Sequence, residues 1–447
     1  MIADQGSTRD SSPLRRIFAN TAWLLGGKGF GAVCGLAYLV ILTRSLGLKD
    51  FGHFSLIFGT AQALIAGVGL ETWRVVVRYG AEHVHHRDWD KFGRLAALCG
   101  LIDAAGAVGA CLVAFVVGYG FSDLLDVNPD YTDMTVAFCC AMAWALVSAP
   151  TGVVRALHRF DVAVYVEAVV PVGRLLAALA IWWTGPSVAR FLLAWAAIDL
   201  VEAALYWRTA RRLRPDAVRF SHLRHWRLGL DENPGIRHFL AVTYAGSLTG
   251  ALMRYGPLLA VGGLVGTSAA GLYRLASQLT QALGKLSTLL TRAVYAEVAR
   301  VRVTSGASEF RRLTLQTSMM AGLAGAAVIG LALALGARLL GFVGGPGFER
   351  GAAVLIPLAL AASLELASVA FEPVLHATGR AAGALLARMI GVLILAVGIA
   401  ALIELRATGI AWAVALASAA TYALLGTLTY VTLRRYARER PAELPQT

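Results

Sequence analysis

The stretch IFANTAWLLGGKGFGAVCGLAYLVILTRSL, residues 17–46, decides the fold because it stays apolar for longer than a bilayer requires. A membrane helix needs about 20 such residues, whereas the apolar core of a secretory signal has only about 7–15. We therefore expect a retained first membrane helix. Lys28 lies deep inside it, where a charge costs about 3 kcal/mol unless it faces water or a partner.

Similar apolar stretches recur along the whole chain, which is 57% hydrophobic, 15% charged and has a mean hydropathy of +0.65. A soluble chain of this length carries about 25% charged residues. We predict an all-α polytopic membrane protein with about 12 transmembrane helices. The expected helices are 17–46, 51–80, 91–120, 132–157, 161–184, 188–211, 238–265, 268–298, 312–343, 349–376, 381–404 and 407–433.

Basic residues gather in every second joint between these helices, as they do in cytoplasmic loops. The joints between them are poor in bases, apart from Arg44 and Lys49 in the first, and residues 122–133 carry only acidic charges. We expect a multi-pass protein of the bacterial inner membrane with both termini in the cytoplasm. This pattern explains the net charge of +13 without a nucleic-acid partner.

The chain repeats itself after 219 residues: Gly47–Phe54 reappears as Gly266–Tyr273, and Gln62–Leu64 as Gln281–Leu283. Two halves with an even number of helices are parallel repeats, related by an axis along the membrane normal. We expect two pseudo-symmetric six-helix bundles around a central cavity. They are an N-terminal lobe (1–213) and a C-terminal lobe (237–447), joined by a cytoplasmic linker (214–236) that reads as an interfacial helix.

Polar residues at helical spacing form stripes on four of the expected helices. Gln278, Gln281 and Lys285 share one face of the eighth helix, and Arg254 lies among small residues on the seventh. We predict a cationic cavity that binds an anion. Ion pairing or snorkelling of the cations, and interhelical hydrogen bonding by Gln278, are the alternatives. The expected substrate-binding residues are Lys28, Arg74, Arg78, Arg254, Gln278, Gln281 and Lys285.

Carboxyl groups inside membrane helices can bind protons and so couple transport to a proton or sodium gradient. For Glu167 and Arg174 we expect structural ion pairing. The cysteines all lie in apolar segments without CxxC spacing, so we predict no disulfide, metal or cofactor. The candidates for coupling are Glu71, Asp103, Asp199, Glu365 and Glu372.

The segment Leu42–Gly47, LTRSLG, followed by Asp50–Ser55, DFGHFS, resembles the opening of Wzx-type polysaccharide and O-antigen flippases. The Gly266–Tyr273 stretch is similar to the joint between their seventh and eighth helices. The turns at Leu375–Arg380 and Gly409–Ala413 are similar to their later joints. These flippases form the polysaccharide transporter family of the multidrug/oligosaccharidyl-lipid/polysaccharide (MOP) superfamily.

The resemblance implies a transporter, not an enzyme, that moves an oligosaccharide on polyprenyl pyrophosphate between leaflets by alternating access. Lipopolysaccharide O-antigen or exopolysaccharide would be the product, and polysaccharide assembly proteins would be partners beside the bilayer. Arg254, Lys285 and Lys28 would neutralise the pyrophosphate, and Arg74 and Arg78 would receive it at the cytoplasmic mouth. Gln278 and Gln281 would hydrogen-bond sugar hydroxyls.

Two other functions stay open. A cation-coupled MATE-like drug or metabolite antiporter has the same fold but would favour an acidic cavity. A membrane polysaccharide polymerase or ligase would need a sizeable external loop, and the longest external joint, 120–131, has no plausible catalytic pair.

Overall fold

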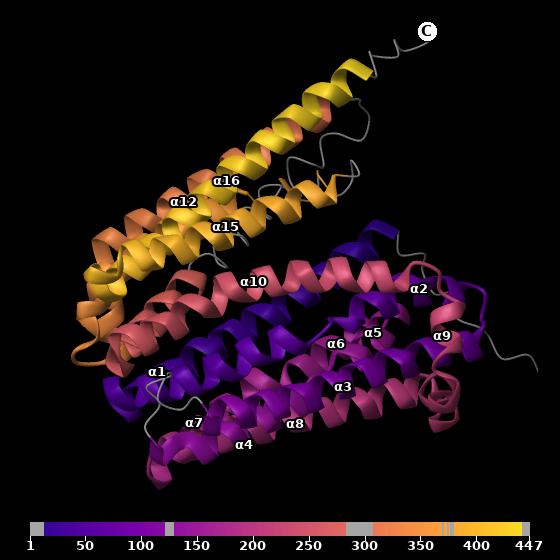
Figure 1. The fold of residues 1–447 in the computed structure, drawn as a ribbon, viewed down its shortest axis with the longest axis horizontal. Coiled ribbons are helices and arrows are strands. Elements are labelled where there is room, and N and C mark those ends of the chain that lie inside the picture. Colours follow the sequence, from indigo (N-terminus) through magenta and orange to yellow (C-terminus); the bar gives the residue numbers. More distant parts are fainter. Residues whose placement is uncertain are drawn as a thin grey trace, which may run out of the picture.

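A computed structural model describes residues 13–120, 129–282, 307–368, 371–372, 375 and 380–439, with side chains of the first helix described from residue 29 onward. All regular elements in these ranges are α-helices or 3₁₀-helices. They form two bundles of long, roughly aligned helices (Figure 1). The expected all-α architecture is confirmed.

The first bundle holds the helices up to the central joint, and the second holds those after it. The first consists of α1 (Pro13–Val68), α2 (Thr72–His85), α3 (Trp89–Gly120), η2 (Pro129–Tyr131), α4 (Thr132–Trp144), α5 (Ser148–Ala156), α6 (Phe160–Glu167), α7 (Val169–Thr184) and α8 (Val188–Leu213). The second consists of α10 (Ile236–Val265), a helical segment at 267–282, α12 (Ala307–Gly344), η5 (Phe348–Gly351), α13 (Ala352–Ala367), α15 (Ala381–Ala401), η6 (Ile403–Leu405) and α16 (Arg406–Glu439).

Within the described ranges, 9 stretches are long and apolar enough to cross a membrane. One of them, Gly29–Val68, contains two of the expected helices, because α1 is two helices that meet at Gly47. The helix α8 and the segment 267–282 match two more expected crossings. The fold is therefore that of a membrane protein with about 12 crossings.

Three of the helices that we expected to be continuous, 51–80, 132–157 and 161–184, are broken. The breaks lie at 69–71, at 145–147 and at Ala168. Pro150 and Pro171 explain the last two, because a proline ring clashes with the carbonyl group four residues earlier. At the first break Glu71 adopts a left-handed conformation with φ of 43°.

The central joint does not form the continuous interfacial helix that we expected. It forms the short turns η3 (Pro215–Val218), η4 (Phe220–His225) and α9 (Leu228–Asp231). A bidentate ion pair between Glu232 and Arg94 fastens the joint to α3. Within the joint, the buried His222 ring hydrogen-bonds to the Asp216 carbonyl at 3.0 Å. The division into lobes at 213/214 and 236/237 stays a prediction.

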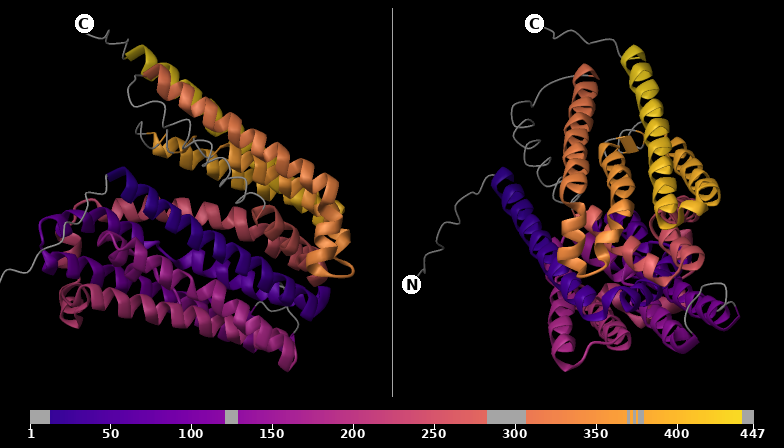
Figure 2. Two further views of the ribbon diagram at one scale, coloured as in Figure 1. Left: turned by 180° about the vertical axis from the view of Figure 1, so that it is seen from behind. Right: turned by 90° about the vertical axis from the view of Figure 1, so that its left-hand side faces the viewer.

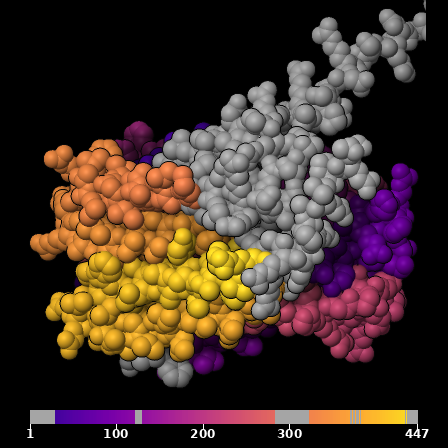
Figure 3. Space-filling model, turned by 90° about the horizontal axis from the view of Figure 1, so that it is seen from above, coloured from indigo at the N-terminus to yellow at the C-terminus, as the bar shows by residue number. Residues whose placement is uncertain are grey.

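Apart from α10, the second bundle touches the first at one end and diverges from it toward the other. One apolar core includes residues of both, with the rings of Phe51 and Phe348 5.9 Å apart. The core around Phe371 and Leu425 contains only residues of the second bundle. The ribbons of α12, α15 and α16 separate from the first bundle toward the end that bears the C-terminus (Figures 1 and 2). From above, the second half covers one end of the first and leaves its other end at the surface (Figure 3).

The helix α10 lies along the first bundle for most of its length (Figure 1). Near its start the Phe239 ring lies 6.0 Å from that of Tyr79, and near its end Leu258 packs against Gly59. It also contacts α15 and α16. This position makes α10 the element between the two halves.

Candidate functional site

Five of the seven predicted substrate-binding residues have side chains that the structure describes. Lys285 and the side chain of Lys28 lie outside the described residues. Arg74 and Arg78 lie on α2, Arg254 lies on α10, and the two glutamines lie on the helical segment 267–282.

Arg254 is exposed in the middle of α10, although the helix around it is apolar enough to span a membrane. Beside it, the Arg388 guanidinium lies 3.8 Å from where a Cβ atom on Gly250 would be, one turn earlier on α10. Glu365 is an electrostatic neighbour of both arginines. Arg388 forms an ion pair with Glu372, whereas Arg254 forms none with the part of the chain that the structure describes.

Arg274 is a site residue that the sequence analysis missed. Its guanidinium carbon lies 5.5 Å from the ring centroid of Phe58, which belongs to the other half. Its strongest electrostatic neighbours are Tyr38 and Tyr255 and two further guanidinium groups, those of Arg174 and Arg254. It makes no ion pair within the described ranges. The signal was available, since Arg274 extends the stripe of Gln278 and Gln281 by one helical turn.

The stripe also contains amide groups with spare hydrogen-bonding capacity. The Oε1 atom of Gln278 is buried and accepts no hydrogen bond from any described residue. Gln281 is exposed and donates through Nε2 to the Ser277 hydroxyl at 3.2 Å. A buried amide oxygen without a donor costs about 1–3 kcal/mol, which a bound hydroxyl group would recover.

Arg174 lies on the first-half side of this group and is neutralised. Both oxygens of Asp199 accept hydrogen bonds from its Nη2 atom at 2.8 Å, and its guanidinium lies over the rings of Phe58 and Trp195. The ring of Phe58 therefore contacts Arg174 from its own half and Arg274 from the other. Glu167 and Arg174 both form ion pairs, as expected, but not with each other. Arg174 pairs with Asp199, and Glu167 pairs with Arg155 at 3.3 Å.

On α2, the two predicted arginines differ. Arg74 forms an ion pair of 2.6 Å with Glu71 and is half-exposed. Arg78 is exposed, lies 4.5 Å from the ring centroid of Phe239, and has no ion-pair partner among the residues described. Of the two, Arg78 has the charge still available to a ligand.

Asp103 fastens two of the broken helices together. Its Oδ1 atom accepts from the Thr72 hydroxyl and its Oδ2 atom from the Ala149 amide, both at 2.7 Å. Thr72 begins α2, and Ala149 lies in the first turn of α5. These helix starts have backbone N–H groups without partners in their own helices, so a buried carboxylate is a fitting acceptor.

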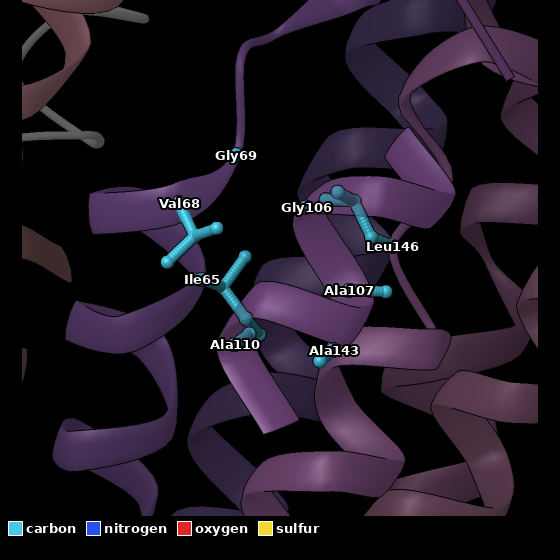
Figure 4. Close-up of a pocket in the computed structure, with 8 residues that line it drawn as sticks. All are labelled: Ile65, Val68, Gly69, Gly106, Ala107, Ala110, Ala143 and Leu146. Atoms are coloured by element: carbon cyan, nitrogen blue, oxygen red, sulfur yellow. The ribbon is translucent and has the colours of Figure 1, made fainter. Parts of the chain in front are cut away.

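Two cavities within the described residues lie away from this group of arginines. One, of about 10 Å³, is apolar and lies among α1, α3 and α4 (Figure 4). Another, of about 280 Å³, lies at the central joint and is lined by Glu82, His83, His86, Asp88, Lys91 and Glu232. The described side chains contain no cluster that could hold a metal ion.

The arrangement can therefore attract an anion to membrane depth. Neither Arg254 nor Arg274 forms a salt bridge with a described carboxylate, and arginine does not lose its proton in proteins. Neighbouring like charges in a medium of low dielectric repel each other, so an anion between them would lower the energy. A planar guanidinium also matches the geometry of phosphate oxygens.

Comparison with known proteins places this geometry in context. Residues 17–295 match the family model described as polysaccharide biosynthesis protein. The inner membrane protein YghQ of Escherichia coli K12 is 26% identical over 298 residues, which cover 64% of this chain and 81% of YghQ.

Solved structures of transporters share the fold at low identity. A multidrug-resistance MATE transporter of the MOP superfamily, in an inward-facing conformation, has a TM-score of 0.69 at 13% identity, covering 92% of this chain and 96% of its own. The lipid II flippase MurJ, in an inward closed conformation, has a TM-score of 0.68 at 10% identity, covering 94% and 93%. A MOP transporter from Pyrococcus furiosus, described as having a binding pocket of reversed polarity, has a TM-score of 0.61 at 13% identity, covering 96% and 97%.

Proposed function

Because this chain belongs to the polysaccharide biosynthesis protein family, we propose that it is a flippase for an oligosaccharide linked to polyprenyl pyrophosphate. It carries this lipid from the cytoplasmic to the periplasmic leaflet of the inner membrane, for surface polysaccharide assembly. One protein with the same fold is named as a lipid II flippase, which supports a lipid-linked sugar as cargo.

The proposal rests mainly on the guanidinium groups of Arg254 and Arg274, which lie near each other and form no salt bridge with a described residue. A pyrophosphate supplies the missing negative charge, and its oxygens accept charge-assisted hydrogen bonds from arginine. Lys28 and Lys285, which the sequence predicts at the same cavity, would add to this charge. Gln278 and Gln281 lie one and two turns further along the stripe, where sugar hydroxyls would follow the pyrophosphate.

The two halves would rock against each other so that the site faces each side of the membrane in turn. We propose that the end with the C-terminus and the central joint is cytoplasmic, since the basic joints lie there. Arg78, and Arg74 once released from Glu71, would meet the lipid headgroup at this mouth. The lobes would be 1–213 and 237–447, with 214–236 between them.

For ion coupling we favour Glu365 among the candidates. Arg74 pairs with Glu71, Arg174 with Asp199 and Arg388 with Glu372, and both Asp103 oxygens accept hydrogen bonds. Glu365 has no described ion-pair partner and is a neighbour of Arg254. A proton on Glu365 would remove the negative charge that competes with the anion for Arg254, so that the protonation of Glu365 and the binding of cargo are linked.

A cellular experiment tests the proposal. The double substitution Arg254→Gln and Arg274→Gln should abolish surface polysaccharide in a strain that depends on this gene. Each lost charge-assisted hydrogen bond costs about 1.5–3 kcal/mol, or tenfold to a hundredfold in affinity. The matched control is Arg212→Gln, because Arg212 is exposed in the last turn of α8, away from the site.

Membrane insertion and protein level are measured in the same cells. Normal polymer from a well-inserted double variant would contradict the proposal. Loss of drug resistance without loss of polymer would favour the antiporter instead.

A further inference from the structure

The repeated motif found in the sequence forms a contact between the two halves. In each half its first glycine makes a corner between two helices: Gly47 has φ of 73° and Gly266 has φ of 114°, values that side chains disfavour. In each half the second glycine, five residues later, faces the opposite corner. We call Gly47–Gly52 and Gly266–Gly271 the two corners.

The contact between the corners is reciprocal and involves backbone atoms. A Cβ atom on Gly52 would lie 2.1 Å from the carbonyl oxygen of Thr267. A Cβ atom on Gly271 would lie 2.9 Å from the carbonyl oxygen of Leu48 and 3.2 Å from the amide nitrogen of Gly52. Only hydrogen fits at either position. The same offset of 219 residues that relates the motifs in sequence relates the two contacts in space.

Contacts further along the same helices are tight but softer. A Cβ atom on Gly262 would meet a methyl group of Leu56 at 2.2 Å, and one on Gly59 would meet a methyl group of Leu258 at 2.7 Å. Leucine side chains can change rotamer, whereas the backbone at a corner cannot move without shifting a whole helix. The corners therefore set how closely the two halves approach.

Two hydrogen bonds from the first half to the end of α12 complete this contact. The Thr43 hydroxyl donates to the carbonyl oxygen of Val343 at 2.9 Å. The Arg44 guanidinium donates to the carbonyl oxygen of Phe342 and lies 5.5 Å from its ring centroid. A cation at a helix C-terminus is favourable, which explains a base in a joint that is otherwise expected to be external.

We propose that Gly52 and Gly271 form a gate that holds the halves together at the corner end and must part when the transporter opens on that side. This inference rests on the alternating-access mechanism of the proposed function. In each copy of the motif the first glycine forms the turn between two helices, and the second forms the surface that closes against the other half. By the predicted topology this end faces the periplasm.

Alanine at either glycine should shift the conformational equilibrium. The added methyl group takes the place of a backbone carbonyl group, so the closed corners lose contact and the state open at that end gains population. Gly246→Ala is the matched control, because Gly246 lies within α10 and no atom approaches its Cβ position within 4 Å.

The experiment uses pulsed electron–electron distance measurements on the full chain in lipid nanodiscs without cargo. Spin labels replace Trp183 at the end of α7 and Leu405 after α15, both exposed, in a chain whose five cysteines are changed to serine. The parent and Gly246→Ala should give the same short distance. Gly52→Ala and Gly271→Ala should raise the ratio of long to short distances about tenfold.

A folded Gly271→Ala variant with the parent's distance distribution would overturn the gate, and so would a shift of the same size in Gly246→Ala. Gly271→Ala serves if Gly52→Ala fails to fold, since its contact of 2.9 Å is less severe than that of 2.1 Å. No lipid-linked sugar is present, so the result does not depend on the cargo. A shift of distances in the glycine variants, together with normal polysaccharide from the Arg254→Gln, Arg274→Gln double variant, would support the gate while contradicting the proposed cargo.

Discussion

Arg254 lies within an apolar span and Arg274 within an expected crossing, where a charge at the membrane centre costs about 3 kcal/mol without a partner. Two neighbouring arginines are neutralised by ion pairs: Arg174 pairs with Asp199 and Arg388 pairs with Glu372. Arg274 instead rests against the ring of Phe58, a contact worth about 0.5–2 kcal/mol, which is less than an anion would provide. Among the described arginines of this group, Arg254 and Arg274 are therefore the two whose positive charge no salt bridge balances.

Sequence reasoning reached one of these arginines and not the other. Arg254 was visible because it interrupts an apolar helix. Arg274 was not, because it lies near the glycine-rich corner, where a charge can be read as belonging to a helix end. Nor could spacing show that Arg174 is neutralised, because Asp199 lies on another helix.

Glu365→Gln should strengthen the binding of polyprenyl pyrophosphate several-fold. The carboxylate is a neighbour of Arg254 and Arg388, and its negative charge competes with the ligand for them. The measurement is ligand affinity of the purified protein in nanodiscs at neutral pH. Glu404→Gln, an exposed position in η6, is the control. Weaker binding by Glu365→Gln would show that this carboxylate helps the ligand and would exclude the proposed competition.

The broken helices belong to the next scale. Pro150 and Pro171 are sequence signals for two of the breaks, which hydropathy alone does not indicate. The break at 69–71 had only Gly67 and Gly69 as signals, and the left-handed Glu71 could not be foreseen. What stabilises this break is tertiary: the Thr72 hydroxyl and the Trp73 amide both hydrogen-bond to the Ser148 hydroxyl at 3.0 Å.

Asp103→Asn should destabilise the first bundle. An asparagine oxygen can still accept from the Ala149 amide, and its amide nitrogen can donate to the Thr72 hydroxyl, but neither bond is then made to a carboxylate. Hydrogen bonds to an ionised group are about twice as strong as neutral ones, so thermal unfolding in detergent should occur at a lower temperature.

The control is Asp90→Asn, because Asp90 is at the start of α3 and makes no such buried bonds. A stable Asp103→Asn protein that transports without a proton gradient would assign Asp103 to coupling instead of to structure.

At the scale of the whole molecule, the repeat predicted more than composition did. The number of crossings and the parallel halves followed from apolar length and the offset of 219 residues. The meeting of the two corners did not, because a contact between halves depends on which of two states is more populated. Such states differ by only a few kcal/mol, which no local pattern encodes.

Binding of two lipids that differ only in charge tests the cationic site most directly. We would measure the affinity of the purified protein in nanodiscs for polyprenyl pyrophosphate and for the uncharged polyprenol of the same length. Polyprenyl pyrophosphate should bind at least tenfold tighter, and the Arg254→Gln, Arg274→Gln double variant should lose that preference while Arg212→Gln keeps it. Equal affinity for the two lipids, or a preference that survives in the folded double variant, would contradict a guanidinium site for the pyrophosphate.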